Sequence, residues 1–126
     1  IPGLVECLGD DDAEVRLLAV SLLDEAGRRA ELAVPALIQA VADPDRLIRV
    51  AAAHCIGKFG QLAADAIPHL LSWLQDNHEY VRLVAAITIL QLDLTKRDEL
   101  MPMILAAQGS ENPVVRSMAE EFIAEQ

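Results

Sequence analysis

Apolar residues recur with helical spacing along most of the chain, and short polar segments separate them. Leu37, Ile38 and Val41 follow an i, i+1, i+4 spacing, which places them on one face of a short helix. Residues 15–26 show a longer pattern that is apolar around most of a helix, so this helix needs neighbours on several sides. Hydrophobic residues make up 53% of the chain and aromatic residues only 3%, which favours close helix packing over a β-sandwich. The pattern predicts an all-α fold.

The short and long helical patterns alternate as a repeat. Each short helix begins beside a proline, and each long helix carries a branched residue followed by arginine, both at offsets of 33, 33 and 34 residues. These positions are Pro2, Pro35, Pro68 and Pro102, and Val15-Arg16, Ile48-Arg49, Val81-Arg82 and Val115-Arg116. Because one repeat cannot bury its own apolar faces, we predict one domain, an α-solenoid of stacked antiparallel helix pairs. Its repeats are 1–33, 34–66, 67–100 and a partial repeat at 101–126.

Polar residues mark the turn inside each repeat. These turns are residues 10–12, 43–45, 76–78 and 110–112. They carry side chains that favour turns and helix N-caps. The long helices are predicted to end near Gly27 and Gly60, where glycine can take a left-handed cap conformation, and Asp93 holds that position in the third repeat. Each repeat is therefore predicted to be a helix-turn-helix hairpin.

The chain resembles HEAT-repeat proteins with short repeats, over its whole length. The resemblance rests on an early proline, a turn aspartate, an apolar-arginine pair and a small residue in the second helix. In the second and third repeats these residues are Pro35, Asp43, Ile48-Arg49 and Ala52, and Pro68, Asp76, Val81-Arg82 and Ala85.

The resemblance implies a ladder of charged pairs between adjacent repeats. It places this ladder on Asp10, Asp43, Asp76, Arg16, Arg49, Arg82 and Arg116. Ser110 stands at the turn position of the fourth repeat, where we expect the ladder to weaken. The alternative is that these arginines are solvated surface residues.

Charge narrows the classes of partner. The chain has 20 acidic and 10 basic residues, a formal net charge of -10, so its surface should repel phosphate backbones and no nucleic-acid partner is expected. Every apolar run is interrupted before the ~18 residues that a membrane helix needs, so no membrane insertion is expected either. We expect a protein or peptide partner that is neutral or basic. The start at Ile1-Pro2 suggests a fragment of a longer protein, and Cys7 and Cys55, interpreted as reduced core residues rather than a disulfide, suggest the cytoplasm.

No catalytic or cofactor motif stands out. His54, His69 and His78 fall at different helical phases without a second ligand at i+3 or i+4, and the acidic run 10–14 lacks the glycine of a calcium loop. His78 is interpreted as a helix cap. We therefore expect no metal, no cofactor and no enzyme activity, and predict a protein-interaction scaffold. The alternative, implied by the resemblance, is an accessory protein of the HEAT-like lyase type that handles a bilin chromophore.

The second helices provide the candidate binding surface. A step of 100° per residue along these helices places some of their residues on the side away from the first helices. In a solenoid this side becomes the concave face. The candidates for partner contact are Leu17, Ser21, Val50, His54, Tyr80, Leu83 and Ile87. The alternative for Leu17, Val50 and Leu83 is burial against neighbouring helices. Apolar residues at both ends of the stack also predict self-association through uncapped ends, and these residues are Leu4, Leu8, Met118, Phe122 and Ile123.

Overall fold

The computed structural model describes residues 2–126, so the beginning of the first predicted repeat, Ile1, lies outside the described residues. These residues form α-helices and short 3-10 segments, without a strand anywhere in 2–126. The α-helices pair within the predicted repeats, as α1 (Pro2–Cys7) with α2 (Ala13–Ala26), α3 (Val34–Ala40) with α4 (Arg46–Ile56), α5 (Ile67–Trp73) with α6 (Glu79–Leu92), and α7 (Arg97–Ala106) with α8 (Pro113–Ala124). The all-α prediction is confirmed.

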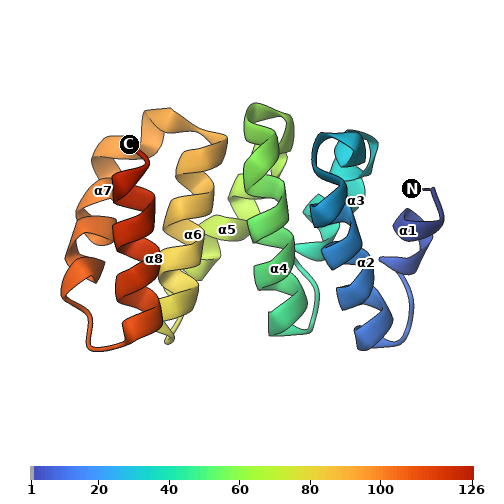
Figure 1. Cartoon of the computed structure of the whole chain (residues 1–126), viewed down its shortest axis with the longest axis horizontal. Helices are drawn as coiled ribbons and strands as arrows, with labels where there is room; N and C mark the ends of the chain where they lie inside the picture. Colours follow the sequence, from blue (N-terminus) through green and yellow to red (C-terminus); the bar gives the residue numbers. More distant parts are fainter. Residues whose placement is uncertain (1) are drawn as a thin grey trace.

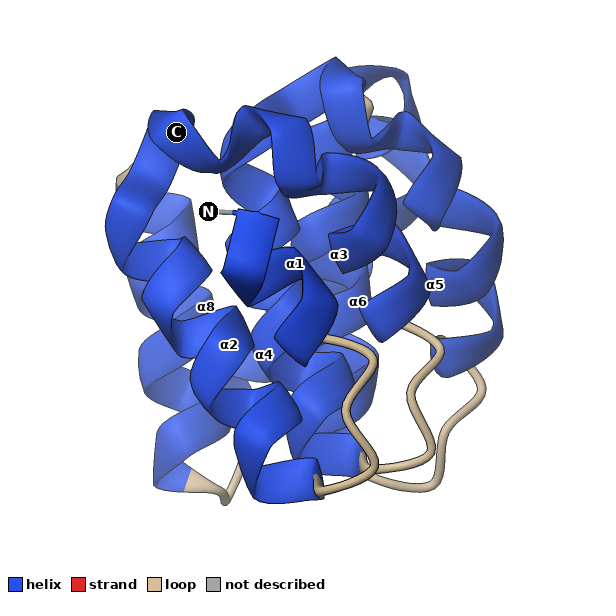
Figure 2. Cartoon of the chain, turned by 90° about the vertical axis from the view of Figure 1, so that its right-hand side faces the viewer, coloured by secondary structure: helices blue, strands red, loops and turns tan. Residues whose placement is uncertain are grey.

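The helices lie in two layers. The second helices α2, α4, α6 and α8 stand side by side and run in the same direction, and the first helices lie behind them (Figure 1). Seen from the N-terminal end, α1 and α2 form the outermost pair of the stack (Figure 2). Each second helix contacts its own first helix and the second helices of the adjacent repeats. This is the α-solenoid of stacked helix pairs that the repeat pattern predicts.

The turns inside the repeats share one hydrogen-bonding scheme. The first turn residue accepts a bond from the backbone N–H two positions later, through Asp10 Oδ1, Asp43 Oδ1, Asp76 Oδ1 and Ser110 Oγ. Asp12, Asp45 and Asn112 then cap α2, α4 and α8 by accepting from N–H groups in the first turn. His78 holds the N-cap position of α6, but its side chain makes no capping hydrogen bond. Its predicted role as a cap is therefore limited to the backbone.

The junctions between repeats depend on glycine in the first half of the chain. Gly27 directly follows α2, and Gly60 lies inside the 3-10 segment η2 (Gly57–Ala66) that follows α4. Their φ angles are 59° and 57°, a positive-φ conformation that disfavours any side chain. Asp93 takes the same position in the third repeat with extended backbone and caps the next segment, η3 (Leu94–Lys96), by accepting from the N–H of Thr95. Hydrogen bonds from the hydroxyl and N–H of Thr95 lower the pKa of Asp93 below its usual value.

The core lies between the two layers and is best covered in the middle of the stack. Ile56, Leu70 and Ile89 are fully buried there. The C-terminal end differs from the sequence prediction of an apolar flank, because Phe122 is buried and Met118 and Ile123 are partly buried against the core. Leu4 and Leu8, at the other end, are also partly buried.

Candidate partner-binding groove

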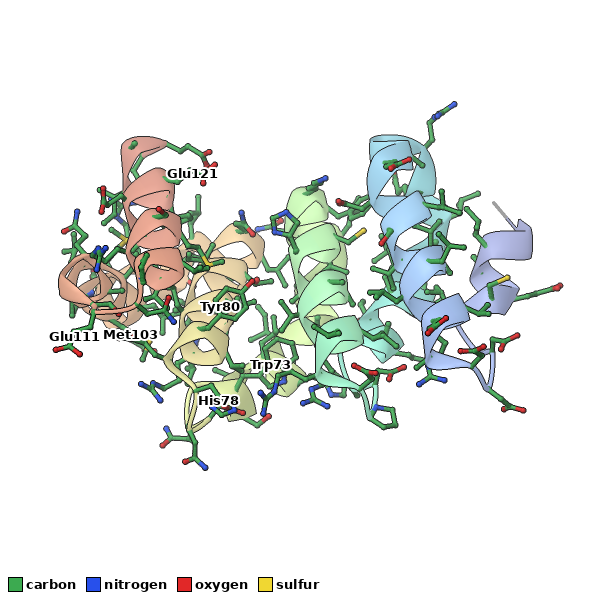
Figure 3. The ribbon with its side chains drawn as sticks, turned by 60° about the horizontal axis from the view of Figure 1, so that its bottom comes forward. Trp73, His78, Tyr80, Met103, Glu111 and Glu121 are labelled. Atoms are coloured by element: carbon green, nitrogen blue, oxygen red, sulfur yellow. The ribbon has the colours of Figure 1, made fainter. Side chains whose placement is uncertain are left out.

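A groove of about 1040 Å³ runs across all four second helices. Six of the seven predicted contact residues line it, namely Leu17, Ser21, Val50, His54, Tyr80 and Ile87. Ser21 and His54 are exposed, whereas the other four are partly buried. Figure 3 shows Tyr80 on α6, near the middle of this surface. The residues that the helical projection selects therefore do lie together on one accessible surface.

Leu83 is a correction to the predicted set. It is 2% exposed and does not line the groove. Leu83 shares a helix face with Ala86 and Leu90, which are also buried. Leu83 packs in the core instead of facing a partner, although its equivalents Leu17 and Val50 in the first two repeats line the groove.

The sequence interpretation missed two of the most exposed aliphatic residues of the groove. Leu47 is 67% exposed and Val114 is 59% exposed. Both stand two residues after the helix N-cap, at the repeat position that Tyr80 occupies in the third repeat. The repeat alignment could have found them, since Tyr80 was already a candidate. The 100° projection did not, because it began further along each helix.

Acidic side chains lie along one edge of the groove. Its lining includes Asp24, Glu121 and Glu125, against Arg46 as a basic residue. Asp24 pairs with Lys58 at 2.6 Å, whereas within residues 2–126 no ion pair joins Glu121 or Glu125. Figure 3 shows Glu121 towards the C-terminal end of α8. The parallel second helices direct their C-terminal carbonyl groups to this same edge, which adds partial negative charge.

A smaller polar pocket of about 400 Å³ adjoins the groove at the opposite edge. It shares Arg46 and Tyr80 with the groove and includes His78, Glu79 and Asn112. Opposite charges on Arg46 and Glu79 leave this edge close to neutral. The groove is therefore asymmetric, with acidic residues at one edge only.

The predicted ladder residues make two kinds of contact. Arg16 Nε donates to Asp43 Oδ2 of the next repeat at 2.8 Å, and this hydrogen bond raises the pKa of Arg16. All four arginines also donate to backbone carbonyl oxygens of the turn in their own repeat, as Arg49 does to Asp43 O at 2.8 Å. Among residues 2–126, no hydrogen bond joins Arg49 to Asp76 or Arg82 to Ser110.

The link between the third and fourth repeats uses a different pair. Ser110 Oγ donates to Glu79 Oε1 at 2.5 Å. Asp10 belongs to the first repeat and accepts the N–H of Asp12 within its own turn. The arginines thus hold the turn of their own repeat in every case, and Arg16 alone, within the described chain, also reaches a turn aspartate of the next repeat.

The cysteines do not give the groove a reactive thiol. Cys55 is buried beside Asp24, and this burial, with the negative charge of Asp24, raises the pKa of its thiol from 9.0 to about 11. Cys7 lies on α1, in the other layer, and is partly exposed. Both are free thiols. In the part of the chain that the structure describes, no group of three or more His, Cys, Asp or Glu side chains could hold a metal ion.

The stacked helix pairs and the surface groove define an α-solenoid repeat protein. A comparison with family models matches residues 1–90, more than half of the chain, to HEAT repeats. The chain belongs to the HEAT-repeat family. HEAT repeats commonly act as protein-interaction scaffolds and are typically non-enzymatic. A comparison with curated protein sequences found no match. Across residues 2–126, the helices are too short or too polar to cross a membrane.

Proposed function

We propose that this chain is a non-enzymatic scaffold that binds an amphipathic segment of a partner protein in the groove. The supporting observation is the continuity of the groove, which crosses α2, α4, α6 and α8 and exposes Leu47 and Val114 at its surface. Exposed aliphatic groups in a concave surface favour binding, because a partner removes them from water. A helix or an extended segment fits this shape.

The charges favour a basic partner segment. The groove carries three acidic residues and one arginine, and the whole chain has a net charge of -10. A segment with apolar residues on one side and Lys or Arg towards the acidic edge would place its charges beside Glu121 and Glu125. Such complementarity sets the orientation of the segment and raises the association rate, while the apolar contacts supply affinity.

Binding of two model peptides tests this proposal. An amphipathic Leu/Lys helix and a matched Leu/Glu helix, each with a fluorescent label, are titrated with the chain, and anisotropy reports binding. We expect the Leu/Lys peptide to bind and the Leu/Glu peptide to bind at least tenfold more weakly. Replacing both exposed groove residues, Leu47→Gln with Val114→Gln, should weaken Leu/Lys binding about tenfold without changing the charge.

The matched control replaces two aliphatic residues of similar exposure on the first-helix layer, Leu71→Gln with Leu105→Gln. These residues lie outside the groove lining, so peptide affinity should not change. Circular dichroism confirms that both double variants stay folded. Equal affinity of the native chain and the groove variant would contradict the proposal, since binding would then reflect net charge alone.

A further inference from the structure

The first repeat exposes residues that the later repeats bury. At one repeat position of the second helix, Leu22 is 39% exposed, whereas its equivalents Cys55, Thr88 and Phe122 are 1%, 2% and 8% exposed. At another, Leu18 is 58% exposed, whereas its equivalent Val84 is 6% exposed and Ala51 and Met118 are partly buried. These equivalents follow from the repeat offsets of 33, 33 and 34 residues. The difference is therefore one of surroundings, because Leu18 and Leu22 are apolar like most of their counterparts.

The contacts of the later repeats show what covers this face. Cys55 lies beside Asp24 of α2, so its position faces the second helix of the preceding repeat. The stack repeats this arrangement, since α2 contacts α4, α4 contacts α6, and α6 contacts α8. In each case the covering element is a parallel second helix. Within residues 2–126, α2 is the first of the second helices, so no second helix lies on its side away from α4 (Figure 2).

The first-helix layer shows the same lack of cover. Leu4 is partly exposed, whereas its equivalents Leu37, Leu70 and Ile104 are fully buried. Cys7 is partly exposed, and its equivalents Ala40, Trp73 and Ala107 are buried. We call Leu4, Cys7, Leu18 and Leu22 the N-terminal face. Because both layers lack cover, an element that covered this face would have the shape of a helix pair and not of a single helix.

The opposite end of the stack rules against filling this face with a second copy placed head to tail. On α8, the repeat positions that face a following repeat carry Glu120 and Ala124, which are exposed. Their equivalents in α4 are Ala53 and Gly57, and a Cβ added at Gly57 would lie 2.1 Å from Gln91 Oε1 of the next repeat. The C-terminal end thus places the carboxylate of Glu120 where α4 presents the buried Ala53 to its neighbour, so a docked copy would have to bury this charge.

A head-to-head dimer fits the N-terminal face less well than a helix pair does. Two chains of net charge -10 would approach through an end that also carries the exposed acidic residues Glu6, Glu14 and Glu25. A stable interface usually buries about 1,200–2,000 Å² in total, far more than a pair of leucines from each copy provides. A parallel helix pair instead reproduces contacts that the chain already makes three times.

We propose that the N-terminal face packs against one more helix pair of the same repeat type, joined to residue 1, with its second helix parallel to α2. In the existing stack, Gly57 of α4 lies against Gln91 of the next repeat, whose equivalent in the first repeat is Glu25, so a small residue of the added helix pair is expected beside Glu25. This interface lies at the end of the stack. Leu18 and Leu22 do not line the groove, but equivalents such as Val84 and Phe122 do, so a further repeat would extend the groove at this end.

Extension of the chain by one repeat tests this interface. A copy of residues 34–66 is placed directly before residue 1, which keeps the native junction because Ile1-Pro2 matches Ile67-Pro68. We expect a single unfolding transition at a higher denaturant concentration than for the 126-residue chain. Leu22→Ser should have little effect in the 126-residue chain and an at least threefold larger loss of unfolding free energy in the extended chain.

Leu71→Ser is the matched control, since Leu71 is an exposed leucine distant from the new junction and should have the same small effect in both chains. A second extension with residues 67–100 guards against a poor fit of one copied repeat. If neither extension raises the midpoint, or if Leu22→Ser has equal effects with and without the extension, the proposal is wrong. Sedimentation equilibrium tests whether the 126-residue chain forms a dimer. A dimer that dissociates in the double variant Leu18→Glu with Leu22→Glu would also contradict the proposal, because a second copy would then cover the face.

Discussion

The two ends of the stack differ although the same repeat builds both. At the N-terminal end, α2 exposes Leu18 and Leu22, whereas at the C-terminal end α8 exposes Glu120 and Glu121 and turns Phe122 inward. Leu22 and Phe122 occupy the same repeat position, so their burial is set by the presence of a preceding repeat. An apolar residue near the end of a repeat array therefore marks an open surface only when its position faces outward.

The largest expected difference between the ends is in side-chain truncation. Phe122→Ala removes a buried ring that packs in the core, so we expect the free energy of unfolding to fall by about 3–5 kcal/mol. Leu22→Ala at the same repeat position removes a partly solvated side chain and should cost less than about 1 kcal/mol. Guanidinium titrations followed by circular dichroism measure both values. Similar losses for the two variants would show that the N-terminal end is already covered in solution.

The fold could be predicted because its signals recur in phase. The prolines, turn residues and arginine positions of one repeat identify the same elements in the next, and the structure places helices and turns where these signals occur. Hydrophobicity alone could not predict which apolar residues of the two terminal repeats are buried. Met118, Phe122 and Ile123 are apolar whether or not they face solvent, and only the structure shows that Phe122 is buried and that Met118 and Ile123 pack partly against the core.

The candidate site was predicted in part, for a similar reason. A helical projection identifies which residues share a face, so it brings Val50, His54 and Ile87 to one surface. It does not tell how closely the adjacent helices approach, which is why Leu83 was assigned to the groove although it is buried. The hydrogen-bonded pairs between repeats also depend on the distance between adjacent helices, which the sequence pattern does not give. Glu79 with Ser110 has no counterpart in the sequence pattern of the other repeats.

An intermediate effect is expected from pH at Cys55, the covered equivalent of Leu22. Burial raises the pKa of this thiol from 9.0 to about 11, so the folded state keeps the proton between these values while the unfolded state loses it. The protonated thiol therefore contributes its full stabilisation of the folded state below pH 9, and this contribution is lost as the pH rises to about 11. The free energy of unfolding should fall by about 2–3 kcal/mol over this range. Denaturant titrations at pH 8, 9, 10 and 11 measure this loss.

Cys55→Ala provides the control for the pH effect, because it removes the thiol and should flatten the pH dependence in this range. Cys7 stays in place as a partly exposed thiol. In the native chain, Cys7 should react with a thiol reagent at pH 8 before Cys55, which becomes reactive only on unfolding. An unchanged slope in Cys55→Ala would assign the pH dependence to other groups.

The smallest expected difference concerns the arginines of the first and last repeats. Arg116 donates to two turn carbonyls, Ser110 O and Glu111 O, so Arg116→Ala should cost about 1 kcal/mol. Arg16 makes the equivalent bonds to its own turn and also pairs with Asp43 of the next repeat, so Arg16→Ala should destabilise the chain more. Asp43→Asn separates the two contributions, since an amide oxygen can still accept the N–H of Asp45. The loss from Asp43→Asn should largely disappear in the Arg16→Ala background, and additive losses in denaturant titrations would show that the cross-repeat pair contributes nothing to stability.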